Sequence, residues 1–150
     1  MAGPHHCEAQ VTSGAEETER LGALLAGGLR AGDVVLVCGD LGAGKTTFVR
    51  GACRALGVTG RVTSPTFTIA RRYETGRLPV SHLDLYRLAG SADEDPDLLE
   101  EELGPDRVAF VEWPDGADRS LRGVRIAARV RLEHDGPQRR LVTIQSAPPA

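Results

Sequence analysis

The chain has 150 residues and a mass of 16.0 kDa, which suits one ordinary globular domain and excludes large multi-domain ATPases. Its net charge of -3 and pI near 5.8 exclude a strongly basic binder of nucleic acids. We therefore expect a single domain over residues 1–150, with residues 1–7 frayed. Any contact with RNA should be local or made through a partner.

The cysteines and the hydropathy pattern indicate a reducing compartment. Cys7, Cys38 and Cys53 are far apart and lack the paired spacing of a zinc site or a redox couple, so we expect three reduced and mostly buried thiols. A secretory signal would need a basic start followed by an apolar run, and the sequence does not show this pattern. No stretch approaches the ~18 apolar residues of a membrane span. A cytoplasmic protein without a membrane segment is the expectation.

The first elements expected along the chain are an edge strand over residues 8–13 and an amphipathic helix. Ser13 is the expected N-cap of this helix, and Glu16, three residues later, completes a capping box. The helix should bury one apolar stripe. That stripe consists of Leu21, Leu24, Leu25 and Leu29.

Residues 34–38 read VVLVC, an uninterrupted apolar run that is typical of a strand covered on both faces. Residues 45–56 then predict a helix closed by Gly57. Further strands are expected over residues 66–74, 78–86 and 107–113, an acidic helix over 93–103, and a hairpin over 124–145. This order predicts an α/β fold, a P-loop NTPase-like three-layer sandwich whose mixed sheet carries an antiparallel C-terminal hairpin.

A glycine-rich segment between the first buried strand and the next helix carries the clearest chemistry. It fits G-x-x-x-x-G-K-[ST] at every fixed position, in the strand-to-helix context that the motif requires. Backbone N–H groups of such a loop point inward, and the helix N-terminus adds partial positive charge. Lys45 is the only lysine of the chain; it should reach the β- and γ-phosphates of ATP, while Thr46 enters a Mg²⁺ shell. The predicted ATP-binding residues are Gly39, Asp40, Leu41, Gly42, Ala43, Gly44, Lys45, Thr46 and Thr47.

Two carboxylates end apolar strands where ligands of open α/β sheets bind. Glu112 follows the run over residues 108–111, and Asp84 follows the run over 80–83. Either one alone could equally be a solvated surface acid, but both strands should end at the same edge of the sheet. We expect Glu112, with Thr46, to bind the metal, and Asp84 to hold a metal-bound or attacking water. The catalytic set is then Lys45, Asp84 and Glu112, and which acid touches Mg²⁺ directly stays open.

Ser64 and Pro65 begin a run of hydroxyl side chains that continues through residues 66–68. A segment that senses the γ-phosphate would lie at this place after the loop helix. A polar turn that leads into a strand explains the pattern equally well.

Three functions compete for this motif. A small GTPase is excluded, because its guanine-reading segment needs asparagine and a second lysine, and the chain contains neither. A small-molecule kinase would need an arginine-bearing lid and an acceptor pocket, where this chain offers a hairpin. A module that binds ATP without hydrolysing it is the third reading, and the two carboxylates argue against it.

GDLGAGKTTFVRG, TSPTFT, HLDLYRL and VEWP, in this order and spacing, resemble the TsaE family, the small bacterial P-loop ATPases of tRNA threonylcarbamoyladenosine synthesis. These motifs lie between residues 39 and 114. The resemblance implies ATP binding, slow hydrolysis, and partnership with the proteins TsaB and TsaD, whose complex the ATPase resets between turnovers. Contact with tRNA would be indirect.

The resemblance also assigns residues by motif. Asp84 matches the acid of the family's H-x-D-x-Y-R motif, and Glu112 the acid of its E-W motif. Thr12 and Ser13 would flank the adenine. No arginine is evidently placed to act as a finger within the chain, and Arg87 is the nearest arginine to the motif acids.

Overall fold

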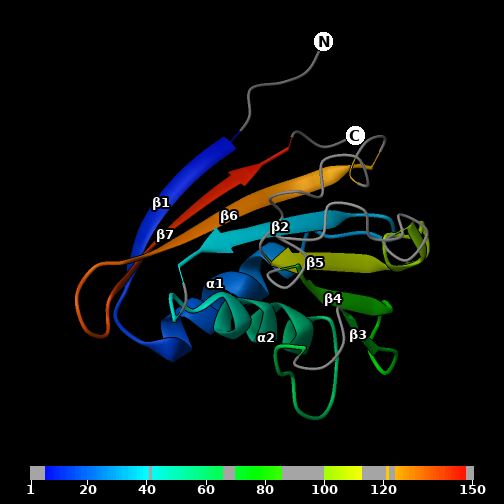
Figure 1. The fold of residues 1–150 in the computed structure, drawn as a ribbon, viewed down its shortest axis with the longest axis horizontal. Coiled ribbons are helices and arrows are strands. Elements are labelled where there is room, and N and C mark those ends of the chain that lie inside the picture. Colours follow the sequence, from blue (N-terminus) through cyan, green and yellow to red (C-terminus); the bar gives the residue numbers. More distant parts are fainter. Residues whose placement is uncertain are drawn as a thin grey trace.

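The computed structural model describes residues 6–40, 42–65, 70–85, 100–112, 121 and 124–147. Within these ranges a mixed sheet of seven strands runs in the order β1-β7-β6-β2-β5-β4-β3 (Figure 1). The strands are β1 (His6–Thr12), β2 (Val34–Gly39), β3 (Ala70–Tyr73), β4 (Val80–Asp84), β5 (Val108–Glu112), β6 (Ile126–His134) and β7 (Arg140–Ser146). The helices are α1 (Ala15–Ala26) and α2 (Lys45–Ala55).

The sheet combines a parallel centre with antiparallel margins. β2 is parallel to both β5 and β6, and β5 is parallel to β4. β6 and β7 form an antiparallel hairpin, β1 pairs with β7, and β3 pairs with β4. The predicted α/β class, with a mixed sheet and an antiparallel C-terminal hairpin, is confirmed. The parallel centre brings the C-terminal ends of β2, β4 and β5 to one edge.

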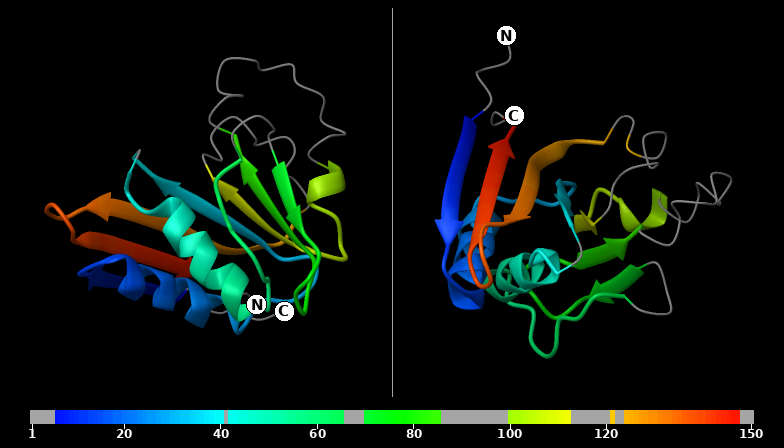
Figure 2. Two further views of the ribbon diagram at one scale, coloured as in Figure 1. Left: turned by 90° about the horizontal axis from the view of Figure 1, so that it is seen from below. Right: turned by 60° about the vertical axis from the view of Figure 1, so that its left-hand side comes forward.

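Both labelled helices cover the same face of the sheet, as the views in Figures 1 and 2 agree. They approach each other unusually closely at two glycines. A Cβ added at Gly22 of α1 would come 2.1 Å from the carbonyl oxygen of Phe48, and one at Gly51 of α2 would come 1.9 Å from that of Glu19. Glycine is therefore required at both contacts, and the packing fixes α2 and the loop before it.

Apolar side chains fill both faces of the central strands. On the helix side, Val35, Val37 and Phe110 pack with Phe48 of α2. On the opposite side, another cluster contains Val34, Leu36, Leu83, Leu85, Ala109 and Val111, with Leu103, Leu121 and Val124 packed against it. Residues 100–102 of the predicted acidic helix are helical, and residues 93–99 lie outside the described ranges.

The predicted start of the first helix was wrong by one residue. The N-cap is Gly14, not Ser13, and no side chain caps the helix through a hydrogen bond. Glu17, not Glu16, reaches back and accepts a hydrogen bond from the backbone N–H of Ser13 at 2.5 Å. Because Glu17 is the third residue of α1, its carboxylate can reach the free donors before the helix.

The predicted apolar stripe of this helix was also partly wrong. Leu24 is 71% exposed, and Leu21 and Leu25 are half-buried. Leu29 is buried as predicted, but it lies beyond the end of α1. The residues of α1 buried in the packed molecule are Thr18, Gly22 and Ala26. Of these, Gly22 faces α2, where the two backbones lie too close together for a larger side chain.

The prediction that residues 1–7 are frayed was wrong for residues 6 and 7. His6 and Cys7 belong to β1, where they pair with Ser146 and Gln145 of β7, while residues 1–5 lie outside the described ranges. Hydrogen bonding to a neighbouring strand orders a terminus that sequence alone marks as free.

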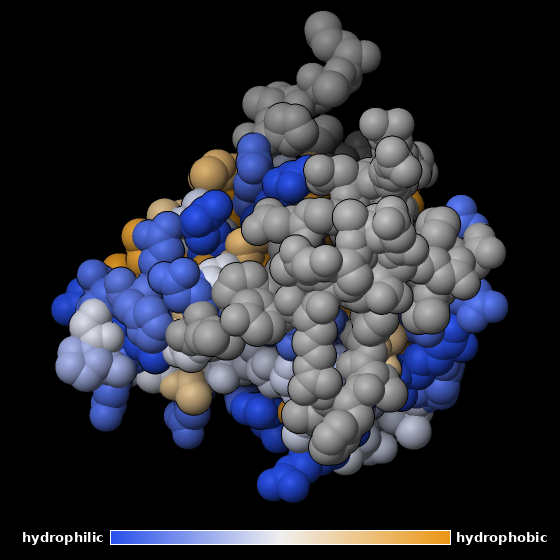
Figure 3. Space-filling model, viewed as in Figure 1, coloured by the Kyte–Doolittle hydropathy of each residue, from blue (hydrophilic) through white to orange (hydrophobic). Residues whose placement is uncertain are grey.

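On the face drawn in Figure 3, apolar colour forms separate patches among hydrophilic side chains of the described residues. Val11 and Leu24 are the large apolar side chains that the described residues expose. No helix within the described ranges is long and apolar enough to cross a membrane.

Candidate functional site

The glycine-rich loop connects the end of β2 to the start of α2. Gly42 and Gly44 adopt positive φ values of 75° and 99°, and Gly44 is the N-cap of α2. Gly39 has a φ of 150°, and a Cβ there would come 2.5 Å from the carbonyl oxygen of Leu132 in β6. Side chains are disfavoured at these positions by backbone conformation or by the approach of β6. The motif's glycines therefore let the chain turn tightly beside the sheet.

Lys45, the first residue of α2, turns its side chain back under this loop. It is only 5% exposed, and its Nζ donates to the carbonyl oxygens of Gly39 at 2.7 Å and Asp40 at 2.8 Å. Burial lowers the pKa of Lys45, and the negative charges of Glu112 and Asp84 oppose that shift. The ammonium group of Lys45 is thus held beneath the loop, near the negative charges of Asp84 in β4 and Glu112 in β5.

The two predicted carboxylates lie side by side. Asp84 of β4 and Glu112 of β5 are register partners in neighbouring parallel strands. Oε1 of Glu112 lies 3.5 Å from the hydroxyl of Thr46, at the limit of a hydrogen bond. Ser64 donates its hydroxyl to Oδ2 of Asp84 at 3.0 Å. The loop helix, two strand ends and the segment before residue 66 therefore meet at one place.

This arrangement has the donors that a nucleotide-bound Mg²⁺ ion uses. Within the described ranges, no group of three His, Cys, Asp or Glu side chains could hold a metal alone. Magnesium in such sites needs only one or two carboxylates, because hydroxyl, water and phosphate oxygens complete its shell. Thr46 and Glu112 fit that donor set, and their metal-binding role stays a prediction.

Sequence reasoning missed His82. This histidine is fully buried in β4, and its Nε2 lies 2.5 Å from Oε2 of Glu112. The alternation of a strand could have found it, since His82 and Asp84 stand two residues apart and share one face of β4.

It also missed Arg140 at the start of β7. Nη2 of Arg140 donates to the carbonyl oxygen of Gly42 at 3.2 Å, and Nη1 donates to that of Arg139 at 2.8 Å. The C-terminal hairpin thereby contacts the glycine-rich loop. No local sequence pattern predicts this contact, because Gly42 and Arg140 lie 98 positions apart in the chain.

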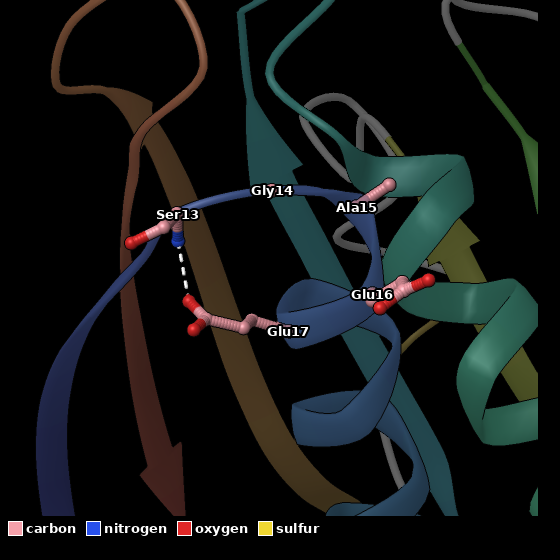
Figure 4. A pocket seen from close by; sticks show the side chains of 5 residues that line it. All are labelled: Ser13, Gly14, Ala15, Glu16 and Glu17. Carbon is pink, nitrogen blue, oxygen red and sulfur yellow. Dashed lines mark hydrogen bonds between the residues drawn. The ribbon is translucent and has the colours of Figure 1, made fainter.

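A shallow hollow of about 300 Å³ lies where α1 begins (Figure 4). Its lining residues are Ser13, Gly14, Ala15, Glu16 and Glu17.

Thr12 and Thr18 lie beside this hollow. Thr12 is 2% exposed and its hydroxyl bonds that of Thr18 at 2.8 Å, so only Ser13 of the two predicted adenine neighbours lines the hollow. A Cβ at Gly44 would lie 3.9 Å from a methyl carbon of Thr18, which places the start of α1 against the glycine-rich loop. The adenine position itself stays a prediction.

Several predicted residues lie outside the described ranges. They are Leu41 of the loop, residues 66–68 of the hydroxyl segment, Arg87, and residues 113–114 of the E-W motif. Their predicted roles are unchanged.

Fold and site together define an α/β protein of the P-loop NTPase-like class. A buried parallel strand enters a glycine-rich turn, a lysine and a threonine begin the helix that follows, and two carboxylates end adjacent strands. The family model "Threonylcarbamoyl adenosine biosynthesis protein TsaE" matches residues 12–142. The chain belongs to the TsaE family, as its motifs predicted.

Curated proteins and a solved structure agree with this assignment. The chain is 47% identical to the tRNA threonylcarbamoyladenosine biosynthesis protein TsaE of Streptomyces coelicolor, over 73% of this chain and 76% of that protein. Identity to the protein of the same name from Bacillus subtilis is 40%, over 85% and 78% of the two chains. The crystal structure of Bacillus subtilis YdiB superposes with a TM-score of 0.78 at 33% identity, covering 96% of this chain and 88% of that one.

Proposed function

We propose that this chain binds ATP with Mg²⁺ at residues 39–47 and hydrolyses it slowly, in support of tRNA threonylcarbamoyladenosine synthesis. The observation that carries the proposal is the meeting of Lys45, Thr46, Glu112 and Asp84 at the C-terminal edge of the parallel strands. Membership of the TsaE family supports the pathway.

The triphosphate would be held mainly by the loop. Backbone N–H groups at the start of α2 and the helix dipole favour an anion there. Lys45 would exchange the carbonyl oxygens of Gly39 and Asp40 for phosphate oxygens, and its ammonium group would then form charge-assisted hydrogen bonds with the nucleotide. The same exchange would raise the lowered pKa of Lys45 again.

Thr46 and Glu112 would hold Mg²⁺, which neutralises charge on the β- and γ-phosphates when it is bound. Asp84, whose carboxylate accepts a hydrogen bond from Ser64, would orient the attacking water. In hydrolysis, the water oxygen forms a bond to the γ-phosphorus, the bond to the bridging oxygen breaks, and ADP and phosphate leave with the released proton.

The partners in this proposal are TsaB and TsaD, as the family resemblance implies, with contact to tRNA made indirectly. The cytoplasm is the proposed location, because tRNA modification takes place there. ATP hydrolysis should be slow without the partners. In P-loop sites the turnover rate rises by large factors when a partner protein supplies positive charge to the transition state.

The experiment that tests this proposal measures ATP turnover by the isolated chain and by the chain mixed with TsaB and TsaD. We expect slow release of phosphate that the partners change, together with nucleotide-dependent co-purification of the three proteins. Lys45→Ala should abolish ATP binding. Binding without any turnover would favour the non-hydrolysing module, and phosphoryl transfer to an added nucleoside or alcohol would favour a small-molecule kinase.

A further inference from the structure

Burying His82 in β4 lowers the stability of the folded state. Its side chain is fully buried on the face that also carries Val80, which packs into the core cluster with α2. Its Nδ1 is buried, and no described residue forms a hydrogen bond with it. A buried polar atom without a partner destabilises the folded state, and an apolar side chain of similar size would avoid that penalty. Some other property of the ring must favour histidine here.

The other ring nitrogen has one specific contact. Nε2 lies 2.5 Å from Oε2 of Glu112, whose side chain is itself almost fully buried. Oε1 of the same carboxylate faces the hydroxyl of Thr46, which donates toward it at 3.5 Å. The two oxygens of Glu112 therefore have different neighbours. Oε2 faces His82 in the adjacent strand, and Oε1 faces Thr46 at the end of the glycine-rich loop.

This division fixes the tautomer. Glu112 accepts from Thr46 on Oε1, as a carboxylate does, so His82 acts as the donor to Oε2 through Nε2–H. In the neutral ring, Nδ1 then has the lone pair. The buried atom left without a partner is in that case an acceptor, which folded proteins tolerate better than an unpaired N–H group.

We propose that His82 is a positioning residue: its Nε2–H anchors Oε2 of Glu112, so that Oε1 stays directed at the site where Thr46 and Glu112 hold Mg²⁺. This inference rests on the proposed function and adds a residue to it. His82 acts only through Glu112 and touches neither nucleotide nor metal. Groups that orient metal-binding carboxylates typically change metal affinity or activity about 10- to 100-fold when they are removed.

Two amide variants separate the role of Nε2 from the packing of the ring. The amide nitrogen of glutamine lies as many bonds from Cα as Nε2 of histidine, whereas that of asparagine corresponds to Nδ1. His82→Gln should keep the Mg²⁺ concentration for half-maximal ATP hydrolysis within about threefold of wild type. His82→Asn and His82→Leu should raise it about 10-fold or more. Thermal unfolding shows which variants are folded. All folded variants should bind ATP equally well in the absence of Mg²⁺.

A merely structural role would give a different result. If His82→Asn and His82→Gln have the same Mg²⁺ dependence, or if ATP binding without Mg²⁺ falls in parallel, the inference is overturned. Nitrogen NMR of the histidine ring tests it without any substitution: we expect the Nε2–H tautomer for His82, and the Nδ1–H tautomer would refute the anchor. Wild-type protein that binds no ATP would instead refute the proposed function.

Discussion

Replacing Gly51 by alanine tests whether the close approach of α1 and α2 is required. On an exposed helix this change is stabilising by about 1 kcal/mol, because alanine is the better helix former. Here the new Cβ would lie 1.9 Å from the carbonyl oxygen of Glu19 and 2.5 Å from its carbon. Real Cβ contacts are essentially never under 3.0 Å, so the two backbones must separate by about 1 Å.

Overpacking costs about 1–3 kcal/mol, and a clash of 1.9 Å with backbone belongs to the upper part of that range, about 2–3 kcal/mol. The gain of about 1 kcal/mol in helix propensity offsets part of this cost. We expect Gly51→Ala to lower the free energy of unfolding by about 1–2 kcal/mol and the Tm by about 2–8 °C. Urea titration and thermal unfolding followed by circular dichroism measure both. Gly28→Ala, in the turn after α1, is the control for an added Cβ without a clash, since this Cβ would meet its nearest atom, the carbonyl oxygen of Leu25, at 3.9 Å. A Gly51→Ala protein at least as stable as wild type would refute this account of the helix contact.

Three further predictions concern single side chains. Burial lowers the pKa of Lys45, whereas a bound triphosphate favours its ammonium form. As the pH rises toward 10.5, ATP affinity should therefore fall and ATP binding should take up protons. Calorimetry in buffers of different ionisation enthalpy measures this uptake, and finding none would contradict the prediction. Arg140→Ala should weaken ATP binding about 2- to 10-fold by freeing the loop, whereas Arg139→Ala should not, and equal effects would argue against the loop contact. Burial raises the pKa of Cys53 to about 12, so iodoacetamide at pH 8 should label exposed Cys7 in the native protein but spare Cys53; mass spectrometry showing equal labelling would disagree.

Short-range patterns predicted most of the architecture. The loop over residues 39–47 is readable because its spacing is fixed and its neighbours are a buried strand and a helix. Asp84 and Glu112 could be assigned to one edge because each ends an apolar run, and parallel strands end together. Their pairing as direct neighbours depends on β4 lying next to β5, which no local pattern specifies.

What sequence reasoning missed depends on contacts between distant segments. Periodicity placed Leu24 on an apolar stripe, but the closeness of the two helices selects Gly22 of α1 for burial. Arg140 reaches Gly42 only because the C-terminal hairpin pairs beside β2. His82 was overlooked for another reason: alternation places it on the same face of β4 as Asp84, but its role depends on contact with Glu112 of the next strand.

In the proposed function, residues 39–47 bind a nucleoside triphosphate, and Thr46 and Glu112 hold its Mg²⁺ ion. Isothermal titration calorimetry of ATP with and without Mg²⁺, on wild type and Glu112→Gln, tests it most directly. We predict that Mg²⁺ strengthens ATP binding to wild type and has little effect on Glu112→Gln, while the two proteins bind Mg²⁺-free ATP alike. Absence of ATP binding to wild type, or the same Mg²⁺ enhancement in both proteins, would contradict the claim.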